Sequence, residues 1–474
     1  MTARPATAVF PARPPRAAPP APRAGLARHR LVPLAAFGAA HVGLALVMQA
    51  LPIVAALHAV SCLVLGLVVA ARRRIQETAY VVAYIVGSEV LWRMTRAGVF
   101  WEYGKYAVSA AVFVALLRIR SPRNRGVALG YLALLLPSAL LTLLALPLEA
   151  ARQQLSFNLS GPLCLALCVL YFSNVRLTES DLRTTLLALI APVISIGTLA
   201  YYSTATAVDL EFVGESNSVT SGGFGPNQVS AMLGLALLFA LLLVLERKMA
   251  RRVRIPLLLL VVVFATQAAL TFSRGGLVLA IAAAFAAMFY LVRDTRARAT
   301  LVVLGALLFS VGKYVVVPRL EEFTSGKLAE RYTSVDPSGR GIIASFDLQI
   351  FADHPVLGVG PGAAPALREE LGHGGAAHTE FTRLLAEHGV LGILAILFLL
   401  FLGIRTILTA RTLQARAYVA AMLVWVTLFL IVNAMRVAAP SFLVGLACAV
   451  AYASLPVRPR ASLPALPAGS RLGP

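Results

Sequence analysis

Long apolar segments separated by short polar connections make up most of the chain between residues 31 and 455. A membrane-spanning helix needs about 20 apolar residues, and fewer when it packs among neighbouring helices. This pattern predicts an all-α polytopic integral membrane protein with about fourteen (12–14) transmembrane helices. Their expected limits are 31–49, 52–71, 77–92, 105–119, 126–147, 160–175, 183–203, 228–246, 255–272, 276–292, 299–317, 389–407, 417–435 and 438–455.

One connection, residues 318–388 between the eleventh and twelfth predicted spans, is far longer than the others. Loops of more than about 15 residues are usually functional or disordered, and a helical pattern within this one indicates an ordered loop. Residues 1–30 are rich in Pro, Ala and Arg and lack the apolar core of a signal peptide, so we expect a disordered tail. The predicted divisions are a tail (1–30), a transmembrane bundle (31–317), the large loop (318–388), C-terminal transmembrane helices (389–455) and a second tail (456–474).

Arginine and lysine are concentrated in the short connections. If the N-terminus is cytoplasmic, every basic cluster falls on the cytoplasmic side, as the positive-inside bias predicts, and so do both termini. The opposite side then holds the large loop and several shorter connections. These are residues 93–104, 148–159, 204–227, the turn at 273–275 and a short turn with Arg436.

The composition supports this topology. The mean hydropathy is +0.81, and 59% of the residues are hydrophobic while 13% are charged, which excludes an ordinary soluble enzyme. A net charge of +21 alone would suggest nucleic-acid binding, but no basic stripe with interleaved aromatic residues exists, so we expect no nucleic-acid partner. All four cysteines lie in apolar segments, which predicts neither a disulfide framework nor a metal site.

The middle of the large loop, PSGRGIIASFDLQIFADHPVLGVGPG, has the pattern of a turn, a short amphipathic helix and a Gly-rich turn. Arg340 lies in the first turn of the expected helix. Gly358, Gly360 and Gly362 form either a plain tight turn or a phosphate cradle of backbone N–H groups, and we favour the tight turn because no strand precedes them. The loop has no DxD-like cluster and the sequence has no HExxH, which favours a metal-independent protein.

Arg274 stands in TFSRGG, between two apolar segments. An arginine at such a turn is most often an interfacial anchor. The functional alternative is that it faces inward and meets an anion, as charges within membranes commonly do. Because guanidinium groups bind phosphate oxygens as a bidentate fork, Arg274 with Arg340 would suit a diphosphate, and Arg331 is a weaker candidate.

His378 lies at the end of the large loop, in HTEFTRLLAEHGVLG at 378–392. An imidazole at a helix start above a membrane can act as a general acid or base. A surface or capping histidine is an equally good interpretation of His378 alone. On the predicted helix after it, Arg383 and Glu387 are four residues apart, opposite the apolar face.

The ordered set of these motifs resembles the O-antigen ligase and Wzy-type polymerase superfamily over residues 220–440. His378 matches the histidine of its signature, Glu387 the acidic position, and Gly389 and Gly392 the glycines, whereas Thr379 stands where the family has Asn or Ser. The matching stretches that precede the histidine motif are GPNQ with Asn227, TFSRGG with Arg274, SGR ending at Arg340, and DHPVLGVGPG.

This resemblance implies a membrane glycosyltransferase of the GT-C type in the bacterial inner membrane, with 318–388 as a periplasmic catalytic loop. The donor would be an undecaprenyl-diphosphate-linked oligosaccharide, and the acceptor a glycan or the lipid A-core. The reaction would be inverting and would need no metal or other cofactor. His378 would be the catalytic base, and the arginines with Asn227 would bind the diphosphate. A flippase and a chain-length regulator are possible partner proteins, besides the membrane lipid.

The motifs leave the precise reaction open. Polymerisation of repeat units ranks slightly ahead of ligation onto the lipid A-core, and protein O-glycosylation is a third variant. A lipid-linked oligosaccharide flippase or another transporter is the alternative from a different class. It predicts related halves and charges deep within several spans, which the sequence does not show. A structural scaffold would leave the arrangement of Arg274, Arg340 and His378 unexplained.

Overall fold

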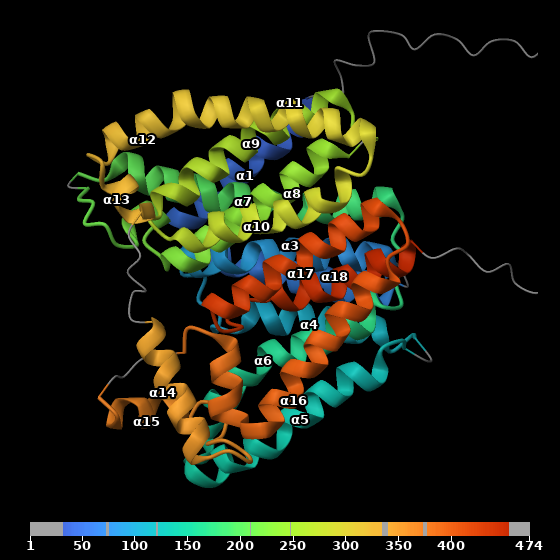
Figure 1. Ribbon diagram of the computed structural model, residues 1–474, viewed down its shortest axis with the longest axis vertical. Helices are drawn as coiled ribbons and strands as arrows, with labels where there is room; N and C mark the ends of the chain where they lie inside the picture. Colours follow the sequence, from blue (N-terminus) through green and yellow to red (C-terminus); the bar gives the residue numbers. More distant parts are fainter. Residues whose placement is uncertain are drawn as a thin grey trace, which may run out of the picture.

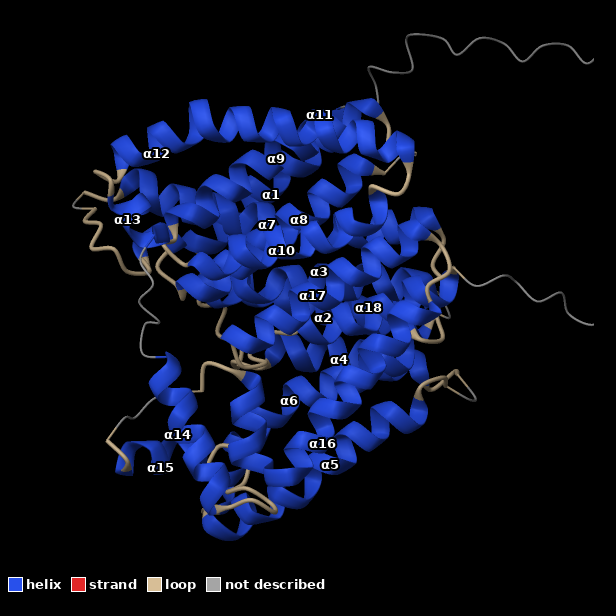
Figure 2. Cartoon of the chain, in the orientation of Figure 1, coloured by secondary structure: helices blue, strands red, loops and turns tan. Residues whose placement is uncertain are grey.

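The structure is a computed structural model that describes residues 32–72, 75–119, 122–208, 210–246, 248–333, 340–372 and 377–454. Within these ranges all regular elements are helices, with no strand (Figure 2), which confirms the predicted all-α class. The predicted tails at 1–30 and 456–474 lie outside the described residues.

The helices follow the hydropathy pattern closely. Short 3₁₀ and π segments occur at Val219–Ser221 and Gly312–Val316. The α-helices are α1 (Val32–Ala50), α2 (Pro52–Ala71), α3 (Ile75–Met94), α4 (Tyr103–Leu116), α5 (Arg125–Ala145), α6 (Leu148–Phe172), α7 (Glu179–Thr206), α8 (Pro226–Leu245), α9 (Arg251–Leu270), α10 (Arg274–Leu291), α11 (Thr295–Val311), α12 (Val317–Phe323), α13 (Lys327–Thr333), α14 (Arg340–Asp353), α15 (Ala364–Glu370), α16 (Glu380–Thr409), α17 (Leu413–Val432) and α18 (Ala439–Ala453).

Ten of the helical segments in the described part of the chain are long and apolar enough to cross a membrane. Three shorter apolar helices, in α1, α4 and α18, add to them. Every predicted span overlaps one helix among α1–α11 and α16–α18. Of these helices, α3 is among neither the ten nor the three, and it carries Glu77 in its first turn and Arg93 in its last. The chain is therefore a polytopic membrane protein, as predicted.

The spanning helices lie side by side across the view, with α13, α14 and α15 gathered at one end of the bundle (Figure 1). Helix α8 is enclosed by its neighbours, since 83% of its most apolar window is buried. The continuous α11–α12 helix lies on the outside with only 6% buried, so its apolar side chains are free to face lipid. The fully enclosed side chains of Trp92 and Trp425 mark the central layer of the bundle.

One predicted connection is wrong. Residues 148–159 were expected to form a loop, but α6 already begins at Leu148. Glu149 and Arg152 form an exposed ion pair of 2.6 Å on one side of this first part of α6. Ala151 in the same segment is fully buried, and Leu155 and Phe157 are partly buried. The segment is therefore an amphipathic extension of the helix, which a search for continuous apolar runs overlooks.

The predicted amphipathic helix in the large loop is confirmed as α14, with Ile343 and Ile350 buried. Asp347 on α14 is fully enclosed and forms an ion pair with Arg368 of α15. It also accepts a hydrogen bond of 2.7 Å from the Thr382 hydroxyl of α16. Burial raises the pKa of Asp347 above its usual value, against the opposing effects of Thr382 and Arg368. One carboxylate therefore fastens three helices of the loop to each other.

Candidate functional site

The histidine motif begins at a capped helix end. The Thr379 side chain accepts a hydrogen bond of 3.2 Å from the N–H of Phe381, which makes Thr379 the N-cap of α16. Asn, Ser and Thr all cap helices in this way, so the departure from the family's Asn or Ser keeps the hydrogen bond. His378 directly precedes the cap and is partly exposed.

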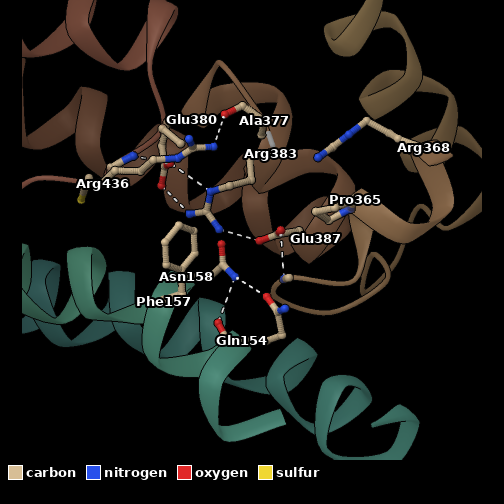
Figure 3. A pocket seen from close by; sticks show the side chains of 13 residues that line it. Gln154, Phe157, Asn158, Pro365, Arg368, Ala377, Glu380, Arg383, Glu387 and Arg436 are labelled. Atoms are coloured by element: carbon tan, nitrogen blue, oxygen red, sulfur yellow. Dashed lines mark hydrogen bonds and ion pairs between the residues drawn. The ribbon is translucent and has the colours of Figure 1, made fainter. Parts of the chain in front are cut away.

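Three buried charges follow on the first turns of α16. Arg383 donates to Glu380 at 2.5 and 3.0 Å and to Glu387 at 2.5 Å. All three side chains are at most 5% exposed. Each carboxylate also accepts a backbone N–H, from Met435 to Glu380 at 2.9 Å and from Gly362 to Glu387 at 3.0 Å. Figure 3 shows these groups converging above α6. Buried charges are tolerated only when paired and fully hydrogen-bonded in this way.

The glycines of the motif allow two backbone segments to touch. Helix α16 is kinked at Gly389, whose φ of 60° and ψ of −139° are non-helical. A Cβ there would lie 2.6 Å from the Pro355 carbonyl oxygen, and one on Gly358 would lie 2.4 Å from the Glu387 carbonyl carbon. Gly392 is equally crowded, because its Cβ would lie 2.0 Å from the Leu384 carbonyl oxygen. These positions accept only glycine without displacing the backbone.

The backbone N–H groups of the Gly-rich turn at 358–362 are hydrogen-bonded to other parts of the protein. Val359 and Gly360 donate to the carbonyls of Ala386 and Glu387, both at 3.0 Å, and Gly358 donates to His354 at 3.1 Å. With the Gly362 N–H bonded to Glu387, these amides are not available to a phosphate. The tight-turn interpretation is confirmed, and the turn's task is to hold the kinked start of α16.

Arg436 lies beside the histidine motif, in the turn between α17 and α18. Its guanidinium donates to the carbonyl of Ala377 at 2.8 Å, the residue before His378, and lies 5.9 Å from the centre of the Phe157 ring. Burial lowers the pKa of Arg436 from its usual value, and Arg383 acts in the same direction. Together with His378, Glu380, Arg383 and Glu387, Arg436 forms what we name the histidine cluster.

Arg93, at the end of α3, ties the histidine cluster to the rest of the bundle. Its guanidinium donates to Glu89 at 2.7 Å, to the Arg436 carbonyl at 3.0 Å and to the Gln228 side chain at 2.6 Å. Glu89 in turn accepts from the N–H of Ala438 at 2.6 Å. Gln228 belongs to the GPNQ motif at the start of α8, so two motifs distant in sequence are joined through α3.

The other predicted binding residues gather where α8 meets α10. Ser273 donates to Asn227 at 2.8 Å, and Arg274 begins α10. Arg331 of α13 donates to the carbonyl of Phe272 at 3.1 Å. Burial raises the pKa of Tyr332 to about 12, against the opposing effect of the guanidinium groups of Arg274 and Arg331. We name Asn227, Ser273, Arg274 and Arg331 the α8–α10 cluster. Arg340 begins α14, but its side chain lies outside the described residues.

The two glycines after Arg274 have different environments. A Cβ on Gly276 would lie 1.9 Å from the Ser230 carbonyl oxygen, whereas the nearest atom to one on Gly275 is 3.9 Å away. Ser230 also donates to the carbonyl of Ser273 at 2.8 Å. The backbone contact between α8 and α10 thus fixes where Arg274 stands relative to Asn227.

Two cavities adjoin the histidine cluster. A small one of about 50 Å³ is lined by Glu380, Arg383, Glu387 and Arg436 (Figure 3). A groove of about 1360 Å³ runs between α4, α5 and α6, and leucine is the commonest residue in its lining. Gln154 and Phe157 line both. The charged site and the apolar groove therefore adjoin at Gln154 and Phe157.

Sequence reasoning missed several functional candidates. Glu89 and Glu380 were not singled out, and Lys105 and Arg436 were noted only for their places beside or in a connection. The available signal was a charge inside or next to an apolar segment, as for Glu89 and Lys105, and the i, i+3 spacing of Glu380 and Arg383. Nothing in the sequence could pair Glu89 with the N–H of Ala438, because 349 residues separate them.

Residues 261–397 match the family model described as O-antigen ligase. The chain carries an O-antigen ligase domain. The predicted superfamily is confirmed over this region, and the family implies glycosyl transfer of the O-antigen ligase or polymerase type between lipid-linked glycan and acceptor substrates. No curated protein matches the sequence. The O-antigen ligase domain includes Arg274, Arg331 and His378, whereas Arg93 and Arg436 lie outside it.

Proposed function

We propose that the protein transfers glycan from an undecaprenyl-diphosphate-linked donor to a glycan acceptor, most simply by polymerising repeat units of a surface polysaccharide. The observation that carries the proposal is the hydrogen-bonded path from Gln228 through Arg93 and Arg436 to Ala377. It joins the helix that carries Asn227 to the residue before His378, which supports the proposal that a base and an anion site lie at the same end of the bundle.

In the proposed reaction His378 takes the proton from an acceptor hydroxyl as the oxygen attacks the anomeric carbon of the donor. The new C–O bond forms on the face opposite the leaving group, so the configuration inverts. The bond to the diphosphate oxygen breaks, and its electron pair leaves with the lipid diphosphate. Arg274, Arg331 and Arg340 would stabilise this negative charge, a task for which positioned cations suffice without a metal.

The supporting residues act through the backbone. Glu387 joins Arg383 to the N–H of Gly362, and Gly389 lets the turn at 355–358 contact α16. Both fix the first turn of α16, which directly follows His378. We propose that Glu387, Gly389 and Gly392 position the base rather than contact the glycan.

The test is complementation of a deletion strain by His378→Ala and Arg274→Ala. Long surface glycan is read on gels beside the membrane level of each variant. His354→Ala is the matched control, since His354 is an exposed histidine of the same loop. We expect both test variants to be present at the normal level and to lack long glycan, and the control to be normal. A fully active His378 variant would exclude this mechanism and make transport the function to test.

The intermediates that accumulate separate the finer alternatives. Single lipid-linked repeats indicate polymerisation, whereas full-length lipid-linked polymer indicates ligation onto the lipid A-core. The same strains, fractionated, test the proposed location in the inner membrane with both termini cytoplasmic. Cross-linking in them tests association with a flippase or a chain-length regulator.

A further inference from the structure

Lys105 is a buried cation without a partner. It is the third residue of α4, its side chain is 1% exposed, and its Nζ has no hydrogen-bond acceptor among the described residues. The Nζ lies 5.8 Å from the centre of the Phe157 ring. Removing an ammonium group from water without a compensating hydrogen bond is costly, so a site of this kind favours the binding of an anion.

Arg436 is a second cation at the same ring. Its guanidinium carbon lies 5.9 Å from the Phe157 centre, and its Nε has no acceptor. In the described part of the chain, the buried carboxylates nearby bind other cations: Glu89 binds Arg93, while Glu380 and Glu387 bind Arg383. Neither Lys105 nor Arg436 forms an ion pair with a described carboxylate. Two positive charges beside Phe157 are therefore available to one anion.

The apolar groove reaches Phe157. Phe157 and Gln154 line both the groove and the charged cavity, and leucines of α5 and α6 such as Leu132, Leu136 and Leu159 line the rest of the groove. An apolar groove with two cations beside Phe157, one of its lining rings, has the complementary shape and charge of a lipid phosphate.

We propose that the groove between α4, α5 and α6 binds a second polyprenyl-phosphate-linked substrate, the acceptor, whose phosphate lies between Lys105 and Arg436 once the Phe157 ring turns aside. This rests on the proposed function, which assigns the donor diphosphate to the α8–α10 cluster. An acceptor that is itself lipid-linked is the substrate of repeat-unit polymerisation.

Binding of undecaprenyl phosphate to the purified full chain tests the proposal, with native mass spectrometry to count the lipids per chain. We expect two lipids on the wild type and one on Lys105→Met, which keeps the length and apolar stem of the side chain. Lys105→Arg should restore the second lipid. The matched control is Lys327→Met, because Lys327 is exposed and forms a surface ion pair with Glu330. A Lys105→Met protein that binds both lipids with wild-type affinity overturns the proposal.

A second variant tests the groove itself. Leu136→Trp adds bulk to an exposed groove residue without changing charge. It should weaken binding of undecaprenyl phosphate at the second site by about tenfold and leave geranyl phosphate binding unchanged. Equal weakening for both lipids, or for neither, contradicts the groove assignment.

The outcomes separate this inference from the proposed function. If Lys105→Met loses one lipid while His378→Ala still makes long glycan, the second lipid site stands and the transfer mechanism fails. If Lys105→Met keeps both lipids while His378→Ala loses long glycan, the transfer mechanism stands and the second site is wrong.

Discussion

The guanidinium group of Arg93 donates a hydrogen bond of 3.0 Å to the backbone carbonyl of Arg436, across 343 residues of sequence. The same guanidinium binds Glu89 and Gln228, so a single side chain connects α3, α8 and the turn before α18. The O-antigen ligase domain at 261–397 contains neither arginine. The geometry around that domain thus depends on helices that lie outside it.

Replacing Arg93 should lower the stability of the protein more than replacing an exposed arginine does. Arg93→Gln leaves Glu89 buried with only the Ala438 N–H as a partner, and breaking a buried ion pair costs about 3–5 kcal/mol. We expect a clear drop in the Tm of the purified protein, with Arg152→Gln as the control because its ion pair is solvent-exposed. Equal Tm values for the two variants would show that the hydrogen bonds and ion pair of Arg93 contribute nothing to the stability of the protein.

Replacing Glu387 by Gln should reduce stability and activity less than replacing it by Ala. In Glu387→Gln the side-chain oxygen can still accept from the Gly362 N–H, while the charge facing Arg383 is lost. Glu387→Ala loses both, leaving the guanidinium with Glu380 alone and the Gly362 N–H buried without an acceptor, at a further cost of about 1–3 kcal/mol. Thermal unfolding and glycan gels should rank the variants as wild type, Gln, then Ala. A ranking with Ala above Gln would contradict this account of Glu387.

A substitution at Gly389 tests whether the kink in α16 is needed for activity. Gly389→Ala places a Cβ 2.6 Å from the Pro355 carbonyl oxygen at a φ of +60°, so we expect the loss of the turn contact and of long glycan. Gly341→Ala is the control, because its Cβ meets nothing within 4 Å and the residue lies in α14. A helical Gly→Ala change of that kind should stabilise by about 0.5–1 kcal/mol. Normal glycan from Gly389→Ala would show that the kink is dispensable.

The adjacent glycines of TFSRGG should behave differently from each other. Gly276→Ala forces apart α8 and α10, since its Cβ would lie 1.9 Å from the Ser230 carbonyl oxygen, and Arg274 would shift away from Asn227. Gly275→Ala has no atom nearer than 3.9 Å and should keep the wild-type Tm and activity. Both are measured by thermal unfolding and complementation. Similar effects of the two substitutions would exclude close helix packing as the reason for Gly276.

The sequence predicts the spanning helices well because each depends on a local property, the transfer of about 20 apolar residues into lipid. It also predicts α14 and the position of His378 at a helix start. The start of α6 was missed because its first part is amphipathic rather than uniformly apolar. The family resemblance placed Glu387 and Gly389 at signature positions, but their partners, Gly362 and Pro355, are visible only once the chain folds back on itself. The predicted binding roles of Asn227, Arg274, Arg331 and Arg340 stay predictions.

The long separation between Glu89 and its partner Ala438 has a consequence for synthesis. Chains grow at about 5–20 residues per second, so α3 waits in the membrane on the order of tens of seconds before α18 exists. During this interval the neighbouring Arg93 can already bind Glu89, since they are one helical turn apart, but the second carboxylate oxygen lacks its N–H donor. In chains that stop after Val432, Glu89 should therefore keep one carboxylate oxygen without a donor, and we expect the quality-control proteases of the membrane to degrade these chains faster. A pulse-chase comparison with the full chain measures this difference in decay. The N-cap residue of α18 therefore completes a site that α3 begins.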